Sequence, residues 1–94
     1  MARIIWSPIA SDDLSGIHEY ISKDSRRYAR IVVRDIISTI REVQQFPFLG
    51  RIVPEYNKPE LRERIYKSYR IIYRVHNEVI EILTIHHSAR VLQL

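Results

Sequence analysis

Two serine-capped amphipathic segments, separated by only two residues, constrain the fold of this chain more than any other feature. Ser7 can cap a helix whose first turn holds Pro8, because a missing N–H costs nothing there. The apolar residues that follow recur at helical spacing: Ala10, Leu14, Ile17 and Ile21. Ser25 caps a second helix of about 20 residues, which Pro47 stops. A connection as short as "KD" predicts an antiparallel helical hairpin.

The second helix carries one continuous apolar stripe, and the rest of the chain has the pattern of strands. The stripe consists of Ala29, Val32, Val33, Ile36, Ile40 and Val43. Strands are expected at residues 3–7, 61–67, 69–75 and 79–87. Residues 46–60, with three prolines and a glycine, form the only predicted loop. Asn77 and Glu78 are expected to make a tight hairpin turn, because Asn tolerates a left-handed backbone.

This order of elements predicts an α+β fold. An N-terminal strand and an antiparallel helical hairpin are followed by a three-stranded antiparallel segment that completes one sheet. A length of 94 residues predicts a single domain, residues 1–94. The absence of cysteine excludes disulfides, thiolate zinc sites and a thiol nucleophile. The start of the chain lacks the pattern of a signal peptide, and no apolar run is long enough to span a bilayer, so a cytoplasmic protein without membrane contact is expected.

A basic region precedes the C-terminus, and the net charge of the chain is +4. Side chains two apart on a strand share a face, so Arg62 lies with Arg64, and Arg70 lies with Arg74. The hairpin should cover the face that carries the apolar residues of the run 69–75. All four arginines are then expected together on the open face, where they can bind a phosphate group. An ordinary solvated sheet face is the alternative interpretation.

The last strand ends on "HHSAR", which contains groups that hold phosphate or transfer protons. His86 and His87 are neighbours and point to opposite faces, so at most one of them can join the arginines; which one is left open. The four histidines have no metal-ligand spacing, and no metal or other cofactor is predicted. The apolar ending, residues 91–94, is expected to dock into a groove or against a strand edge.

Four segments together resemble the RelE/ParE superfamily of toxins from type II toxin–antitoxin systems. They are "WSPIASDDLSGIHEYI", "FPFLGRIVPE", "LRERIYKSYRIIYRV" and "VIEILTIHHSAR", and they span nearly the whole chain. The resemblance implies a compact α+β fold related to microbial ribonucleases. It also implies a cognate antitoxin, acidic or amphipathic, that wraps the toxin and that a basic face would attract.

The resemblance leaves two functions open. ParE-like members poison DNA gyrase, whereas RelE-like members are metal-free, ribosome-dependent mRNA endonucleases (mRNA interferases). For a nuclease, the resemblance implies catalytic roles for His87, Arg70 and Arg90, and phosphate binding by Arg70 with the basic pair Arg62 and Arg64. Arg74 completes the basic set.

Two features of the tail favour the gyrase poison. No tyrosine lies near the C-terminus, where RelE-like nucleases often need one, and the "HSAR" ending is similar to the "HGAR" of the ParE-type branch. A basic domain that only binds another protein is a third interpretation. Arg70 is expected to face solvent, so Arg70→Ala should leave the fold intact.

Overall fold

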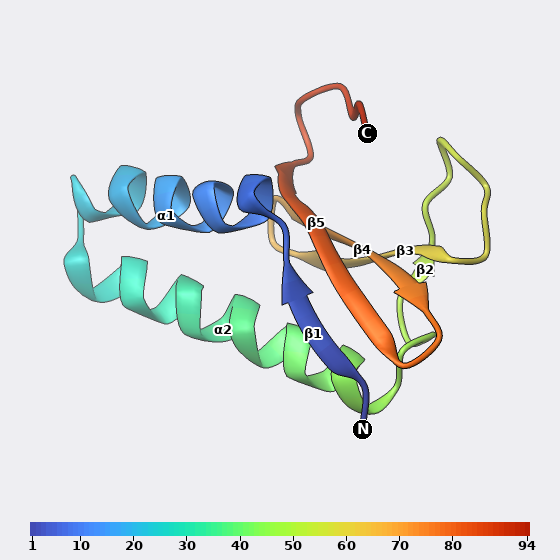
Figure 1. Ribbon diagram of the computed structural model, residues 1–94. Coiled ribbons are helices and arrows are strands. Elements are labelled where there is room, and N and C mark those ends of the chain that lie inside the picture. The colour runs from blue at the N-terminus through green and yellow to red at the C-terminus, as the bar shows by residue number, and fades with distance from the viewer.

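The computed structural model describes all 94 residues and has the predicted α+β architecture (Figure 1). The elements are, in chain order, β1 (Arg3–Trp6), α1 (Pro8–Ser22), α2 (Arg26–Gln45), β2 (Arg51–Ile52), β3 (Leu61–Tyr66), β4 (Tyr69–His76) and β5 (Val79–His87). The strands form one sheet in the order β1-β5-β4-β3-β2. Two details go beyond the prediction. β1 pairs in parallel with β5, and the predicted loop contains the short strand β2, which pairs with β3.

The two helices begin and end where their capping residues predict. The Ser7 hydroxyl accepts a hydrogen bond from the Ala10 amide, and Ser25 does the same for Tyr28. Ser7 also donates to the carbonyl of Leu83 on β5 at 2.8 Å, so one side chain caps α1 and fastens it to the sheet. Neither helix has the length and apolar character that crossing a membrane requires.

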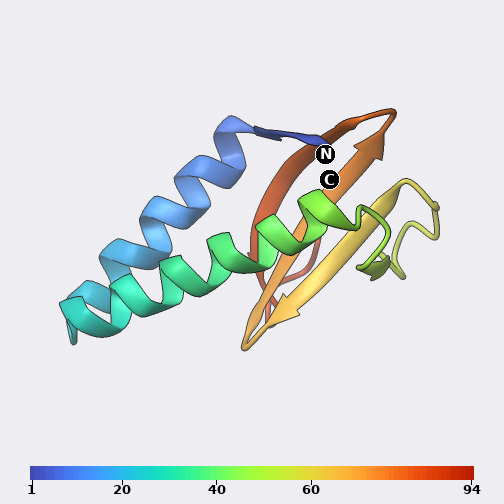
Figure 2. The same ribbon diagram turned by 90° about the horizontal axis from the view of Figure 1, so that it is seen from below.

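The main core lies between the helical hairpin and one face of the sheet (Figure 2). It contains 11 buried residues: Ala10, Val32, Ile36, Ile40, Val43, Ile71, Tyr73, Val75, Ile80, Ile82 and Ile85. The odd-numbered residues of β4 therefore face the helices, as predicted. The Tyr73 hydroxyl is fully buried and satisfied, because it donates to the carbonyl of Pro47 and accepts from the amide of Gly50.

The opposite face of the sheet is not open, which corrects the expectation from the sequence. A second apolar cluster covers its centre: Val53, Leu61, Ile72 and Leu92. Val53 comes from the loop before β3, and Leu92 comes from the C-terminal tail. The amide of Leu94 also donates to the Tyr56 hydroxyl at 2.9 Å. The apolar ending thus docks on its own sheet and fastens the loop and the tail over this face.

Candidate functional site

The four arginines expected on one face are divided between the two faces of the sheet. The turn between β3 and β4 holds two residues, Lys67 and Ser68, so Tyr66 pairs with Tyr69. In this register Arg62 lies opposite Tyr73, and directly paired residues share a face. Arg62 and Arg64 therefore lie on the helix side, whereas Arg70 and Arg74 lie on the other side. The expected four-arginine phosphate site is wrong in its geometry.

Three of these arginines reach different partners around the sheet. The guanidinium of Arg62 stacks on the ring of Phe48 at 4.9 Å and donates to the carbonyls of Pro59 and Gly50. Arg64 lies 3.5 Å from Glu42 of α2. Arg74 lies 3.7 Å from Glu81 of β5. Each of the three is engaged by a different partner, and Arg74 lies on the opposite face of the sheet from Arg62 and Arg64.

Arg70 is buried in a network of carboxylates rather than exposed to solvent. Its Nε donates to Glu63 at 2.6 Å, and its two terminal nitrogens donate to Glu55 at 2.6 and 2.7 Å. Glu63 is 1% exposed, and Arg51 donates to its second oxygen. The hydrogen bonds that Arg70 donates lower the pKa of Glu55 to about 2, and the same bonds, which Glu55 accepts, are the main reason that the pKa of Arg70 is raised. Nε and both terminal nitrogens of Arg70 therefore each already have a carboxylate acceptor.

A bulge in β5 decides which histidine shares a face with Arg70. Tyr73 pairs with Ile82, but the preceding residue, Ile72, pairs with Thr84, so Leu83 is an extra residue in β5. Beyond the bulge, His86 lies opposite Arg70. His86 does not reach the guanidinium, however, because its Nε2 donates to the carbonyl of Arg90 at 2.8 Å.

His87 lies on the helix side, where it lines a groove beside α1. Its ring meets the ring of Tyr69 edge-on, with the centroids 5.5 Å apart. The groove has a volume of about 680 Å³ and is also lined by Arg90, Asp12 and Asp13. The proposed catalytic set is thus only partly assembled. His87 and Arg90 share a groove, but Arg70 is on the far face of the sheet.

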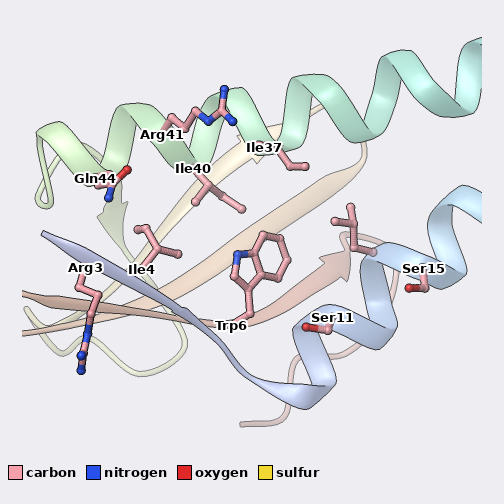
Figure 3. A pocket seen from close by; sticks show the side chains of 10 residues that line it. Arg3, Ile4, Trp6, Ser11, Ser15, Ile37, Ile40, Arg41 and Gln44 are labelled. Atoms are coloured by element: carbon pink, nitrogen blue, oxygen red, sulfur yellow. The ribbon is translucent and has the colours of Figure 1, made fainter.

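A second groove, of about 690 Å³, opens between β1 and the two helices (Figure 3). Trp6 and Ile4 of β1 face Ile40 of α2 across it. Two cations lie at its rim: Arg3 points to the other side of β1 from Ile4, and Arg41 points away from β1. No acidic residue lines it. β1 is an edge strand, and the amides of Arg3 and Ser7 point to β5. The backbone groups of Ile4 and Trp6 consequently point away from the sheet, toward a possible partner.

The donor atoms in the structure do not form a metal site. No group of three or more His, Asp or Glu side chains is placed to hold a metal ion. Asp13, the most promising oxygen donor near His87, already accepts hydrogen bonds from the Thr84 hydroxyl and the Ile85 amide. The chemistry available here is that of imidazole, guanidinium and carboxylate groups.

Residues 4–92 match the family described as "ParE toxin of type II toxin-antitoxin system, parDE". The chain belongs to this family. A solved structure entitled "Chromosomal ParDE TA system from P. aeruginosa" superimposes on this ParE-family chain with a TM-score of 0.76. The two chains are 26% identical, and the match covers 93% of this chain and 96% of the other.

Other solved toxins share the fold at lower identity. A YoeB/ParE toxin from Agrobacterium tumefaciens matches at a TM-score of 0.62 and 20% identity, covering 90% of this chain and 96% of the other. A YoeB dimer from Staphylococcus aureus matches at 0.61 and 20%, covering 92% and 95%. A search of curated protein sequences finds no match. The two structures at 20% identity show the fold alone; membership of a toxin family of type II toxin–antitoxin systems is what supports a cognate antitoxin as a partner.

Sequence reasoning identified the arginines and histidines of this ParE-family chain but missed the partners that occupy them. Glu63 alternates in β3 with two arginines, and this "RER" pattern was the available signal for an internal ion pair. Glu55 gave no signal, because it comes from a loop. The groove at β1 was also missed, although Ile4 and Trp6 alternate with Arg3 and Ile5 on the predicted N-terminal strand.

Proposed function

We propose that this chain is the growth-inhibiting toxin of a type II toxin–antitoxin pair and that it acts as a poison of DNA gyrase. Its membership of the ParE family supports the gyrase target over a ribosomal one. The HSAR ending and the lack of a tyrosine near the C-terminus support the same choice.

The observation that carries this proposal is the position of Arg70. Metal-free RNA cleavage needs a general base, a general acid and cations around one phosphate. Here Arg70 is held by Glu55 and Glu63, on the opposite face of the sheet from His87. A phosphate would have to displace a bidentate carboxylate before Arg70 could bind it. An inhibitor that works by binding another protein has no need of such a gathered set.

A supercoiling assay tests the gyrase proposal. Relaxed plasmid, purified gyrase and ATP are incubated with increasing concentrations of the purified protein, and supercoiled product is expected to fall while cleaved plasmid rises. The matched control replaces gyrase with a type I topoisomerase, whose relaxation of supercoiled plasmid should not change. Full supercoiling at concentrations that stop growth would rule the proposal out.

The second candidate function is a ribosome-dependent mRNA endonuclease, and the groove beside α1 is the observation in its favour. His87 and Arg90 line this groove together, so an acid–base group and a phosphate-binding cation can meet one substrate. The test is primer extension on mRNA from programmed ribosomes. Cleavage that is lost in His87→Gln would favour the nuclease and displace the gyrase proposal, whereas intact transcripts would eliminate the nuclease.

We also propose that the cognate antitoxin is acidic, wraps the toxin, and places an extended segment in the groove between β1 and the helices (Figure 3). Apolar side chains would pack on Trp6 and Ile40, and carboxylates would meet Arg3 and Arg41. A segment of this kind could also pair with the open edge of β1.

The test expresses the open reading frame adjacent to the gene of this chain, which the proposal expects to encode a small acidic protein, and measures the binding of its product by calorimetry. Arg3→Glu with Arg41→Glu should weaken binding at least tenfold. Arg74→Glu with Arg90→Glu, which changes the net charge equally, is the control. Equal effects of the two pairs would remove the groove from the proposal.

A further inference from the structure

Helix α2 carries a row of arginines along one exposed side. The row consists of Arg26, Arg27, Arg30, Arg34 and Arg41, all exposed. At about 100° per residue, these five positions fall within an arc of roughly 100° on the helix surface. A rise of about 1.5 Å per residue makes the row roughly 22 Å long. We call this surface the α2 arginine row.

Most of the cations in the row have no partner in the protein. Among the ion pairs of the structure, only that of Arg34 with Asp35 involves the row. The two acidic residues of α2 are shared with or held by β3. One oxygen of Asp35 accepts from Arg34 while the other accepts from Tyr66, and Glu42 pairs with Arg64. The row is thus a positive surface that the chain itself does not neutralise.

The row opposes the stability of its own helix. The first turn of α2 contains Arg26 and Arg27 and no acidic residue, although the positive end of the helix dipole disfavours cations there. Arg26, Arg30 and Arg34 follow one another at four-residue spacing, where like charges repel. The row therefore costs the helix stability. Such a cost is expected where side chains are placed to bind an anion rather than to support the fold.

The character of the row indicates which anion it fits. The one large apolar side chain within the arc is Ile37, which is half-buried and lines the groove beside β1. The exposed Tyr28 and Phe46 project from other sides of the helix and its end. The centre of a protein–protein interface is normally apolar, whereas the charge of a nucleic-acid backbone is neutralised mainly by arginine and lysine side chains, with no need of apolar contacts. We propose that the α2 arginine row binds the phosphate backbone of duplex DNA, without reading its sequence.

This binding goes beyond the proposed function and does not depend on it, because it requires neither gyrase nor an antitoxin. Several phosphate contacts without base contacts give dissociation constants of about 10⁻⁴ to 10⁻⁶ M at physiological salt. The affinity should fall steeply as salt rises, because each neutralised phosphate releases counterions.

Fluorescence anisotropy with a labelled 24-base-pair duplex tests the proposal at several salt concentrations. The test variant combines Arg26→Gln, Arg27→Gln and Arg30→Gln; it leaves Arg41 in place because that residue also lines the groove beside β1. The control variant combines Lys58→Gln, Arg74→Gln and Arg90→Gln, which lie outside α2. Each variant loses three positive charges from a chain whose net charge is +4, so any effect of net charge alone is matched.

The test variant should bind the duplex at least tenfold more weakly than the control variant at low salt. The slope of log K against log salt should fall by about 0.9 for each lost phosphate contact. Equal weakening in the two variants would show an effect of net charge and overturn the proposal. Competition by polyglutamate as efficient as that by unlabelled duplex would also overturn it, because the row would then accept an acidic polypeptide. Thermal unfolding followed by circular dichroism confirms that the variants compared are folded.

Discussion

Arg70 and Glu63 form a buried ion pair between adjacent strands, with 2.6 Å between Arg70 Nε and Glu63 Oε1. They are diagonal neighbours, because Arg70 lies directly opposite Ile65 and Glu63 lies directly opposite Ile72. Glu55 completes the pair from the loop, so the guanidinium joins three segments of the chain. This relationship makes Arg70 a structural residue of the protein, whatever else it does.

Arg70→Ala should therefore destabilise the protein, which replaces the expectation that the fold stays intact. Removing one partner of a buried ion pair leaves an uncompensated charge and costs about 3 to 5 kcal/mol. Urea unfolding at pH 7 measures the change. The double variant Glu63→Gln with Arg70→Met should lose less, because no buried charge remains. If Arg70→Ala unfolds at the same urea concentration as the wild type, the ion pairs of Arg70 with Glu55 and Glu63 do not stabilise the fold.

Gly50 and Gly16 should respond in opposite ways to alanine. A Cβ on Gly50 would lie 2.5 Å from the carbonyl oxygen of Glu63 and 2.7 Å from the Tyr73 hydroxyl, so Gly50→Ala should cost about 1 to 3 kcal/mol or more. Gly16 has nothing within 4 Å of that position, so Gly16→Ala in α1 should gain up to about 1 kcal/mol. Thermal melting of both variants checks the contrast. A stable Gly50→Ala would mean that the loop does not approach β3 this closely.

Leu92→Ala should loosen the C-terminal tail and destabilise the fold by about 2 kcal/mol or more. Leu92 is 8% exposed in the cluster with Val53, Leu61 and Ile72, and removing a buried leucine side chain leaves a cavity. Val91→Ala is the matched control, because Val91 is 82% exposed and should change stability by less than about 0.5 kcal/mol. Chemical denaturation measures both values. Equal values would indicate that the tail does not pack on the sheet in solution.

Acid should weaken the protein through Glu55. Its folded pKa of about 2 is below the ordinary value of 4.5, so its ion pair with Arg70 stabilises the fold above pH 4.5. That stabilisation is lost as the pH falls from 4.5 toward 2, where the carboxylate becomes protonated in the folded state. Glu55→Gln should be less stable than wild type at pH 7, and the difference should disappear near pH 2. If the free energies of unfolding of the two proteins differ by the same amount at every pH from 7 to 2, the lowered pKa of Glu55 is contradicted.

Much of the fold could be predicted because its signals are local. Ser7, Pro8, Ser25 and Pro47 mark helix ends through the hydrogen bonds that they make or lack within one turn. Periodicity marked both helices and the strands β3 and β4, a nearly continuous apolar run marked β5, and β-branched and aromatic residues marked β1. The two-residue strand β2 was missed because it has no pattern of its own and exists only through its pairing with β3.

The candidate site could be predicted in composition but not in arrangement. Arg70, His87 and Arg90 were selected for their chemistry, yet the structure places Arg70 on one face and His87 on the other. Two short features cause this. The two-residue turn after Tyr66 sets the register of β3 on β4, and the bulge at Leu83 changes the face on which each following residue of β5 lies.

By itself, the sequence determined the helices, their ends, the alternating strands and the types of charged group near the C-terminus. Only the tertiary structure decided which groups meet, because strand side chains alternate with a period of two and a shift of one residue moves each to the opposite face. The same holds for burial. Arg70 is enclosed because the register of the β3–β4 hairpin brings Glu63 to it and the loop before β3 folds back with Glu55.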